Sequence, residues 1–420
     1  MREMKDSGVE WIGEIPESWA TEQIGRRADQ TKCKNDGMIE TNLLSLSYGK
    51  VKRRDINATE GLLPESFEGY NIIEENDIVL RFTDLQNDQK SLRVGRATER
   101  GIITSAYTTI RPFDSEDSEF LYYALHSYDL KKGFYGMGAG VRQGLKWQEA
   151  KYVEIPWPDI QVRTAICQFL DKKCEEIDKS IEAAEASIEK YKLYKKSAIF
   201  QTVTKGLNHN VPMKDSGELW LGSIPENWDV VYPKALFVPR KEKARPDDIM
   251  LTASQHYGMI SQDKFIKKQS YTPVAVGKGH DILKHVEPDD FVISMRSFQG
   301  GLEYCRIRGK MSSAYIALEV TDDRVNPEYF KWLLKSERYI EMLQSTTNLV
   351  RDGQALRFAN IIQGNLPLPP DAEQERIASF LDLKCEEIDR AVEAKQQITD
   401  ELKAYKKSLI WEVVTGKREV

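Results

Sequence analysis

Two stretches of basic and amide side chains have the chemistry to contact DNA. Arginine, glutamine and asparagine match the hydrogen-bonding edges of bases in the major groove, and lysine matches phosphate. The stretches are RFTDLQNDQ at 81–89 and MRSFQGG at 295–301, and each follows a short apolar run. We predict that both form loops that read bases, although any single residue in them could instead be a solvated surface charge.

The predicted DNA contacts come from both halves of the chain. They are aromatic, hydroxyl, amide and basic side chains in or beside predicted loops. The first half contributes Tyr48, Arg53, Arg54, Arg81, Thr83, Gln86, Lys90, Arg93, Arg142, Gln143 and Lys146. The second half contributes Arg240, Lys243, His256, Tyr257, Lys264, Arg296, Ser297, Gln299, Arg351 and Arg357.

No motif in the sequence predicts catalysis by this chain. The stretch VGKGH at 276–280 lacks the first glycine and the hydroxyl residue of a phosphate-binding loop. The glycine-rich stretch at 133–144 follows no predicted strand, so we interpret it as a mobile loop rather than a cofactor site. The five histidines form no HExxH pattern and no cluster with cysteine. We therefore predict no catalytic residue and no metal site.

The stretch NPEYF at 326–330 resembles the [DN]PP[YF] motif of amino-methyltransferases. Glu328 replaces the second proline of that motif, and no glycine-rich cofactor strand accompanies it. Asn326 and Pro327 are better interpreted as the cap and first residue of a helix.

The elements that must position these side chains are present twice. Residues 4–19 read MKDSGVEWIGEIPESW and residues 213–228 read MKDSGELWLGSIPENW, with eleven of sixteen positions identical. FLDKKCEEID at 169–178 returns as FLDLKCEEID at 380–389. The middles of the two copies match only at scattered positions: SYG at 47–49 faces HYG at 256–258, and NDIVLRF at 76–82 faces DDFVISM at 289–295. A shared scaffold with different contents is expected if two like modules each read a different target.

Local patterns predict short strands in each middle region and helices near 117–128 and 327–344. After prolines at 156–158 and 367–370, long charged segments follow at about 160–203 and 371–414. Apolar residues recur there at heptad-like spacing, as at Ile177, Ile181, Ala184 and Ile188. We predict two long helices that pair antiparallel. The alternative is that each helix packs only on its own domain.

Composition limits the class of protein. The chain has 420 residues, with 40% hydrophobic and 30% charged residues, enough for two or three globular domains. A net charge of −6 argues against non-specific DNA binding through overall charge, but it allows a local basic face. Five cysteines without a CxxC pair and an N-terminal stretch without an apolar signal core predict a cytoplasmic location. No run of 18 apolar residues occurs, so no membrane contact is expected.

These motifs closely resemble those of the specificity (S) subunit of type I restriction–modification systems. The resemblance rests on SGVEWIGEIPESW, SGELWLGSIPENW and LPLPPDAEQERIASFLDLKCEEID at 366–389, and it covers essentially the whole chain. The last stretch is near the family pattern PP-x-x-EQ-x-x-I-x-x-FLD, on Pro369, Pro370, Glu373, Gln374, Ile377, Phe380, Leu381 and Asp382. The first copy departs from it, with Asp159 for the second proline and Val162–Arg163 for Glu-Gln. That departure leaves open whether the first junction binds partners differently.

The resemblance implies a non-catalytic subunit with two target-recognition domains, each of which reads one half of a bipartite, asymmetric DNA site. It implies two modification subunits as partners, which bind S-adenosylmethionine and methylate adenine, and restriction subunits that use ATP and Mg. On this basis the chain itself binds no cofactor.

We therefore expect an α+β fold with two duplicated mixed α/β target-recognition domains separated by two long antiparallel coiled-coil helices. The expected domains are 1–157, a first recognition domain with its lead-in; 158–206, a central helix; 207–368, a second recognition domain; and 369–420, a distal helix. Two alternatives to a DNA-specificity subunit remain. One is a two-headed protein-binding adaptor, and the other is a stand-alone nuclease or methyltransferase.

Overall fold

The chain divides into two compact units that share the two long helices. The computed structural model describes residues 2–57, 64, 66–85, 88, 90–137, 144–269, 282–294, 297–346 and 356–420. Unit 1 consists of residues 1–185 and 397–420, and unit 2 of residues 186–396.

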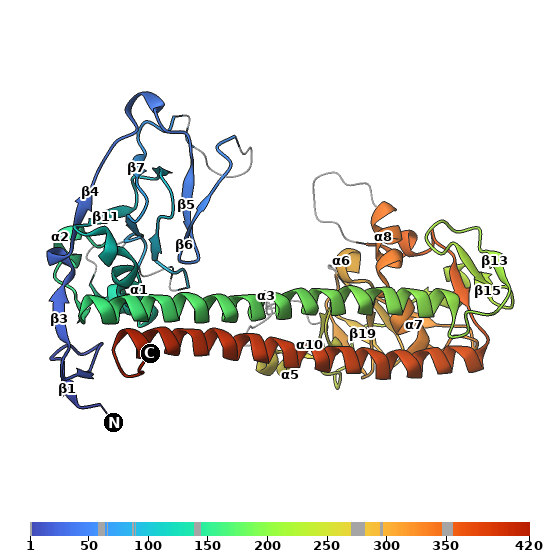
Figure 1. The fold of residues 1–420 in the computed structure, drawn as a ribbon. Coiled ribbons are helices and arrows are strands. Elements are labelled where there is room, and N and C mark those ends of the chain that lie inside the picture. Colours follow the sequence, from blue (N-terminus) through green and yellow to red (C-terminus); the bar gives the residue numbers. More distant parts are fainter. Residues whose placement is uncertain are drawn as a thin grey trace. The chain divides into compact units, whose positions relative to one another are not determined.

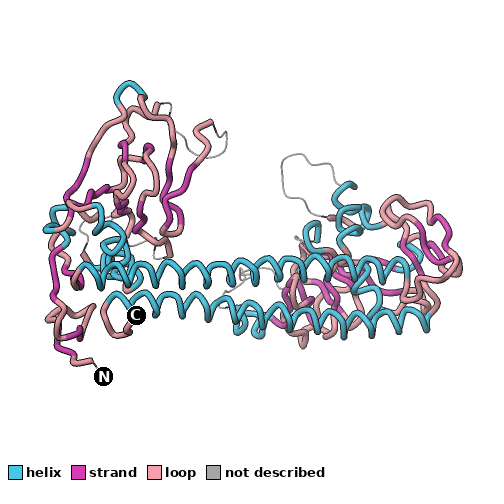
Figure 2. The backbone as a smooth tube through the Cα atoms, in the orientation of Figure 1, coloured by secondary structure: helices cyan, strands magenta, loops and turns pink. Residues whose placement is uncertain are grey.

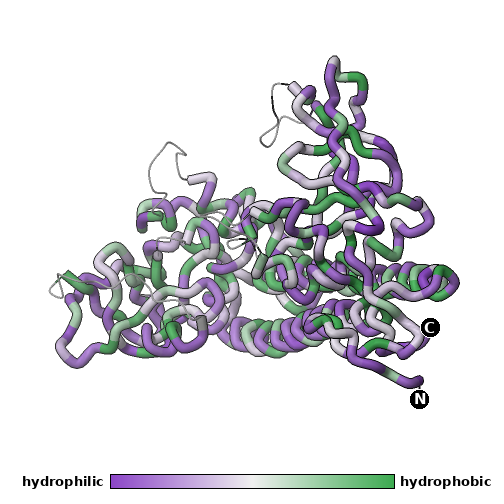
Figure 3. The backbone as a smooth tube through the Cα atoms, turned by 90° about the vertical axis from the view of Figure 1, so that its left-hand side faces the viewer, coloured by the Kyte–Doolittle hydropathy of each residue, from purple (hydrophilic) through white to green (hydrophobic). Residues whose placement is uncertain are grey.

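Two long helices, α3 (Ile160–Lys205) and α10 (Asp371–Val414), begin where the sequence pattern predicted them (Figure 1). In unit 1 they pack antiparallel, with ion pairs from Lys406 to Asp178 and from Lys403 to Glu185. In unit 2 Lys195 pairs with Asp389 across the same two helices. The predicted seam residues Ile177, Ile181 and Ile188 are buried. The predicted antiparallel coiled coil is therefore confirmed. Figure 3 shows hydrophilic and hydrophobic residues interspersed along the backbone. Both helices also contribute to the apolar core of each unit, so pairing with each other and packing on a domain are not exclusive alternatives.

Unit 1 is built around an antiparallel four-stranded sheet in the order β4-β11-β8-β9. Small two-stranded ladders surround it: β1 with β2, β3 with β12, β5 with β6, and β7 with β10. The strands are β1 (Met4–Asp6), β2 (Glu14–Pro16), β3 (Ala20–Gln23), β4 (Ala28–Thr31), β5 (Leu44–Ser47), β6 (Lys50–Arg53), β7 (Asn71–Ile73), β8 (Ile78–Leu80), β9 (Val94–Arg96), β10 (Gly101–Ile103), β11 (Thr108–Pro112) and β12 (Glu154–Trp157). The helices are η1 (Ile24–Arg26), η2 (Asp36–Met38), η3 (Ser115–Asp117), α1 (Ser118–Leu130), η4 (Gly133–Gly136) and α2 (Trp147–Ala150).

Unit 2 repeats this plan, with a four-stranded sheet in the order β16-β23-β20-β21. Its strands are β13 (Met213–Asp215), β14 (Ser223–Pro225), β15 (Asp229–Val231), β16 (Phe237–Pro239), β17 (Leu251–Ser254), β18 (Gly258–Ser261), β19 (Lys284–Val286), β20 (Phe291–Ile293), β21 (Glu303–Tyr304), β22 (Gly309–Met311), β23 (Ile316–Val320) and β24 (Leu366–Leu368). Its helices are α4 (Pro233–Leu236), α5 (Gln262–Gln269), α6 (Ser297–Gly300), α7 (Pro327–Leu333), α8 (Glu337–Ser345) and α9 (Phe358–Ile361). Figure 2 shows that the strands of both units are short and joined by long connections.

Each unit has its own apolar core, in which residues of both long helices pack against the α/β domain. In unit 1 the core joins the sheet, α1 and the long helices through Phe120, Leu170 and Leu409. In unit 2 the core joins β16, α7 and α10 through Phe237, Phe330 and Leu381. Burial of these side chains holds each α/β domain against the helix pair, because removing apolar surface from water is the main favourable term in packing.

Three local predictions can be compared with the structure. The helix predicted near 117–128 is α1, and Asn326 caps α7 as predicted, since its side chain accepts the Glu328 N–H at 3.0 Å. The single helix predicted at 327–344 is instead two helices, α7 and α8. The break occurs because Leu334 ends α7 and its carbonyl accepts a hydrogen bond from the Leu302 N–H.

The glycine-rich stretch predicted as a mobile loop is only partly described. Residues 133–136 form η4, whose Phe134 is fully buried, so this part is an element of the core and the prediction is wrong there. Residues 138–143 lie outside the described residues. Of the described helices, none is both long and apolar enough to cross a membrane.

Candidate nucleic-acid interface

In unit 1 the β5–β6 hairpin carries three predicted DNA contacts at the surface. Tyr48 lies in the turn with a φ of +48° and is 84% exposed. Arg53 forms a bidentate ion pair with Glu99 through its Nε and Nη2 atoms, yet its side chain remains 74% exposed. Arg54 follows it and is also exposed. The ion pair orients the Arg53 guanidinium, and the exposed side chain could still donate to a base or phosphate.

The loop after β8 carries the next group. Thr83 and Lys90 are exposed, and Arg81 is partly exposed. Arg81 pairs with Asp88 at 3.1 Å. Hydrogen bonds from Ser91 hold the pKa of Asp88 down at about 2, and the charge of Arg81 contributes to the same shift. The positive charge of Arg81 is therefore partly neutralised by Asp88, within the same loop that the sequence predicted to read bases.

The structure brings the hairpin and the loop together. A Cβ placed on Gly49, in the hairpin turn, would lie 3.2 Å from Leu92, which leads from the loop into β9. Leu145 donates its N–H to the Phe82 carbonyl at 3.0 Å, so Lys146, exposed at the start of α2, lies next to the same loop. The hairpin turn with Tyr48, the loop after β8 and Lys146 therefore lie beside one another, although their sequence positions span about a hundred residues.

Unit 2 has the equivalent arrangement. A Cβ on Gly300 of α6 would lie 2.8 Å from Gln255, in the turn of the β17–β18 hairpin. His256 and Tyr257 of that turn contact each other edge to face, with ring centroids 4.5 Å apart. Lys268 of α5 lies 4.7 Å above the Tyr257 ring. The exposed candidates of unit 2 are Lys243, His256, Lys264, Gln299 and Arg357.

Arg357 has the same local structure as Lys146. Each residue precedes a one-turn helix, and its backbone N–H donates to a side-chain oxygen three residues later, at 3.0 Å in both cases. The two basic residues are therefore equivalent positions of the duplicated scaffold, in agreement with the facing sequences VRQGLKW at 141–147 and VRDGQALRF at 350–358.

Three predicted contacts are corrected by their burial. Arg93 is fully buried and donates to backbone carbonyls, so it presents no charge to a ligand. Ser297 is buried, and its Oγ accepts the Ser294 N–H at 2.8 Å. The Arg240 side chain is only 10% exposed and pairs with buried Asp290 at 2.7 and 2.9 Å. Hydrogen bonds to Asp290 and Glu242 raise the pKa of Arg240. Its positive charge is therefore paired within the domain rather than presented to a ligand. Gln86, Arg142, Gln143, Arg296 and Arg351 lie outside the described residues.

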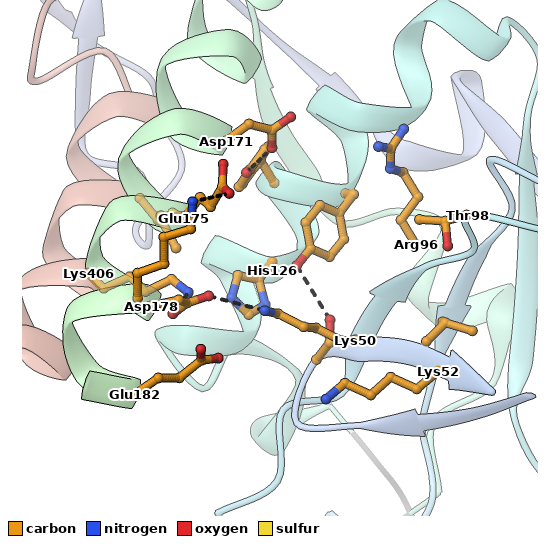
Figure 4. Close-up of a pocket in the computed structure, with 17 residues that line it drawn as sticks. Lys50, Lys52, Arg96, Thr98, His126, Asp171, Glu175, Asp178, Glu182 and Lys406 are labelled. Atoms are coloured by element: carbon orange, nitrogen blue, oxygen red, sulfur yellow. Dashed lines mark hydrogen bonds and ion pairs between the residues drawn. The ribbon is translucent and has the colours of Figure 1, made fainter. Parts of the chain in front are cut away.

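A pocket of about 510 Å³ in unit 1 was not predicted (Figure 4). The β5–β6 hairpin, α1 and both long helices line it. Asp178 of α3 accepts hydrogen bonds from Lys406 of α10 and Lys50 of the hairpin, and the Tyr123 hydroxyl donates to Asp171 at 2.5 Å. Asp171 and Asp178 are the two aspartates of FLDKKCEEID, so this repeated motif joins the recognition domain to the helices.

The same contacts recur in unit 2. Trp332 donates its indole N–H to Asp382, and Lys195 binds Asp389, the two aspartates of FLDLKCEEID. Arg306 pairs with Glu328, as Arg96 pairs with Glu119 in unit 1. The signal that could have revealed this role was the retention of both aspartates in both copies.

The first copy departs from the family pattern where its long helix begins, yet it keeps an equivalent contact between helix and domain. In unit 2 buried Gln374 bonds the Pro369 carbonyl at 2.8 Å and the Asn326 N–H at 2.9 Å, at the start of α7. In unit 1 Arg163 donates to the Pro158 carbonyl at 2.6 Å and to Asp117, before α1, at 2.5 Å. Arg163 therefore makes the equivalent junction between helix and domain by an ion pair instead of an amide.

Comparisons with known proteins agree with this architecture, although no family model matches the chain. The chain is 22% identical over 437 residues, covering 97% of it and 96% of the relative, to a protein of Methanocaldococcus jannaschii provisionally named type I restriction enzyme MjaX specificity subunit. It is 26% identical over 132 residues to the type I restriction enzyme EcoBI specificity subunit of Escherichia coli, covering 31% of this chain and 27% of the relative.

Solved structures show the fold. One chain, from work on complex assembly and conformational transition of the type I R-M system, matches with a TM-score of 0.67 and 14% identity over 96% of this chain and 99% of its own. The HsdS subunit from Thermoanaerobacter tengcongensis matches with a TM-score of 0.50 and 14% identity over 96% of this chain and 98% of its own. The resemblance to type I specificity subunits is thereby confirmed. At this level of identity the specificity-subunit fold is shared, while the contents of the recognition domains are this chain's own.

Proposed function

We propose that the chain is the DNA sequence-specificity subunit of a type I restriction–modification complex. Its two recognition domains read the halves of a bipartite, asymmetric site, and it scaffolds the adenine-methylating and restriction subunits in the cytoplasm. One observation carries the proposal. Both units place a hairpin turn beside the loop that follows β8 or β20. Among the described residues the unit 1 site presents basic, hydroxyl and aromatic side chains, and the unit 2 site presents basic, amide and aromatic ones.

The two sites have the chemistry to read bases in the major groove. Arg53, Arg81 and Gln299 can donate to base edges, whereas Lys90 and Lys264 suit phosphates. Adenine methylation requires the base to leave the helical stack, a step that belongs to the modification subunits. S-adenosylmethionine, ATP and Mg are then needed only on the partner subunits.

The outer faces of the long helices are the proposed docking surface for those partners. Leu193 and Tyr194 of α3 and Leu383 of α10 are large apolar side chains of unit 2 that are exposed. Burial of such side chains by a partner helix would be favourable, because each removes apolar area from water.

Single substitutions in the complete complex test the proposal. Arg81→Ala is expected to relax only one half of the methylated motif and Gln299→Ala only the other, since a lost bidentate base contact costs about 1–3 kcal/mol. The measurement is the methylated motif in cells that also express the modification subunits. Equal relaxation of both halves by one substitution would contradict the assignment of one domain to each half-site.

Two further measurements separate the alternatives. Affinity for DNA should fall steeply as salt rises, because phosphate contacts release counterions, whereas a protein-binding adaptor would show no DNA specificity. The purified chain alone should transfer no methyl group and cleave no DNA. Robust methyl transfer without a second subunit would support the enzyme alternative and exclude the proposed role.

A further inference from the structure

Arg93 is a buried arginine whose guanidinium is bound almost entirely by backbone carbonyls. Its Nη1 donates to the carbonyls of Arg81 at 3.1 Å and Thr83 at 2.8 Å. Its Nη2 donates to those of Asp84 at 3.1 Å and Asp88 at 2.5 Å. The ring of Tyr135 lies 4.8 Å from the guanidinium carbon. Burial of a charged guanidinium is costly unless hydrogen bonds replace those it makes to water, and here the four carbonyls supply them.

The four carbonyls belong to one loop, the segment 81–88 that follows β8. The loop leaves the β ladder after Leu80, so strand pairing does not set its shape. Asp84 has a φ of +58°, in the left-handed region that L residues rarely adopt. The hydrogen bonds from Arg93 reach both the beginning and the end of the loop, and they offset the cost of this conformation.

Arg93 itself is fixed from the opposite side. Its backbone N–H donates to Asp129 of α1 at 2.7 Å, and the Arg81 N–H donates to the Arg93 carbonyl at 2.8 Å. Among the described residues of the loop, Thr83 is exposed and Arg81 is partly exposed. A rigid α1 is therefore connected through Arg93 to the loop that presents two of the predicted DNA contacts.

Unit 2 has no equivalent of this residue. Strand register places Arg96 opposite Ile78 and Tyr304 opposite Phe291, so Gly301 occupies the position of Arg93. A Cβ on Gly301 would lie 2.2 Å from the Leu334 carbonyl, which leaves no room for a side chain. The described part of the unit 2 loop is held instead by the hydrogen bond between Ser294 and Ser297 and by α6.

We propose that Arg93 is a positioning residue for DNA specificity: it holds the loop 81–88 in its reading conformation and so determines the half-site read by unit 1 without touching DNA. The inference rests on the proposed function, because it requires that this loop reads bases. According to this inference, a buried residue of unit 1 affects only the half of the target that unit 1 reads.

The test uses the complete complex with Arg93→Met, which keeps the length of the side chain and removes its donors. Arg93→Lys, which cannot bridge four carbonyls, is the second variant in case the first does not fold. We expect faster amide hydrogen exchange in residues 81–90 and unchanged exchange in α1. Discrimination at the half-site of unit 1 should fall about tenfold or more, and that of unit 2 should be retained.

Arg111→Met is the matched control. Arg111 pairs with buried Asp77 in the same sheet but makes no hydrogen bond to the loop, so it tests general destabilisation of unit 1. The control should lower stability while both half-sequences persist. If Arg93→Met relaxes both half-sites equally, or has the same effect as Arg111→Met, the positioning role is wrong.

A third variant separates this inference from the proposed function. If Arg81→Ala relaxes one half-site and Arg93→Met changes neither, only the positioning role is overturned. If a chain with both Arg81→Ala and Thr83→Val still methylates the original motif, the loop reads no bases, and the inference fails with the assigned reading site.

Discussion

At the scale of single residues, burial shifts the pKa values of two groups on α1 in opposite directions. Burial lowers the pKa of His126 from 6.5 to about 4. Burial raises the pKa of Asp129 from 3.8 to about 6, although the hydrogen bond from the Arg93 N–H opposes this shift. Figure 4 shows His126 between Lys50 of the hairpin and the acidic side of α3. No protein partner of its Nδ1 atom occurs among the described residues.

His126→Phe should make unit 1 less sensitive to acid. The folded state disfavours the imidazolium, so the His126 contribution is intact above pH 6.5 and is lost as pH falls towards 4, by about 3 kcal/mol. The free energy of unfolding of His126→Phe relative to the parent should therefore increase as pH falls through this range. Urea titrations at several pH values measure it, and the exposed His209→Gln serves as a control. A difference that does not depend on pH would show that the imidazole is not disfavoured when charged.

Asp129→Asn should show the opposite dependence. Because its folded pKa is raised, Asp129 favours the folded state below pH 3.8 and loses that contribution as pH rises through about 6, again by about 3 kcal/mol. The variant should gain stability over the parent in this window, while its amide oxygen can still accept the Arg93 N–H. In the parent the two slopes oppose each other between pH 4 and 6. If Asp129→Asn gains nothing at pH 7, the carboxyl is not disfavoured by burial.

At the scale of elements, a lysine at the end of each long helix holds a lead-in hairpin. Lys417 donates to the carbonyls of Ile12 at 2.5 Å and Glu14 at 2.9 Å, next to β2. Lys205 donates to the carbonyls of Leu221 and Ser223, next to β14. Burial lowers the pKa of both lysines. The repeated sequence thus encodes a contact between helix end and hairpin that occurs in each unit.

Lys417→Met should loosen only the β1–β2 hairpin, and Lys205→Met only β13–β14. Hydrogen bonds from a charged donor contribute about 1.5–3 kcal/mol each, and their loss leaves carbonyls unpaired. Hydrogen exchange of the two hairpins measures the effect, and the exposed Lys407→Met on α10 is the matched control. Loosening of both hairpins by either substitution, or by the control, would contradict a contact that is local to each unit.

At the scale of the whole molecule, the boundary between the units falls inside both long helices, after Glu185 and after Gln396. Insertion of one heptad into each helix, near Ser187 and near Lys395, keeps the seam of Ile181, Ala184 and Ile188 in register. It adds about 10 Å, or about three base pairs at 3.4 Å each. We expect both half-sequences to be retained with a longer spacer. Activity should be lower, because about three base pairs also rotate one half-site by about a quarter turn.

The methylated motif of the lengthened protein checks this expectation. Insertion into α3 alone is the control. The ion pairs on the two sides of the insertion, Lys406–Asp178 and Lys195–Asp389, can then no longer both stay in register, so activity should be abolished. An unchanged spacer with full activity would show that the helices do not set the distance. Altered half-sequences would mean that the reading surfaces are misplaced.

Much of the architecture could be derived from local sequence signals. The long helices follow from heptad spacing without glycine or proline, and the cap at Asn326 follows from one residue and its neighbours. The duplication follows from repeated letters alone. Such features need only contacts between residues close in the chain, or a comparison of the chain with itself.

The candidate site depended on the tertiary structure. Arg81 and Arg93 have the same chemistry in the sequence, yet one presents its side chain at the surface and the other is fully buried among backbone carbonyls. Likewise, Arg163 replaces the glutamine of the second copy only because Asp117 lies within reach of it. Whether a charge faces solvent or an internal partner is decided by the groups that folding brings around it, since desolvation must be offset by hydrogen bonds from distant parts of the chain. The sequence by itself determined that there are two like modules on one helical scaffold, and the tertiary structure decided which of their charged side chains are exposed at the surface.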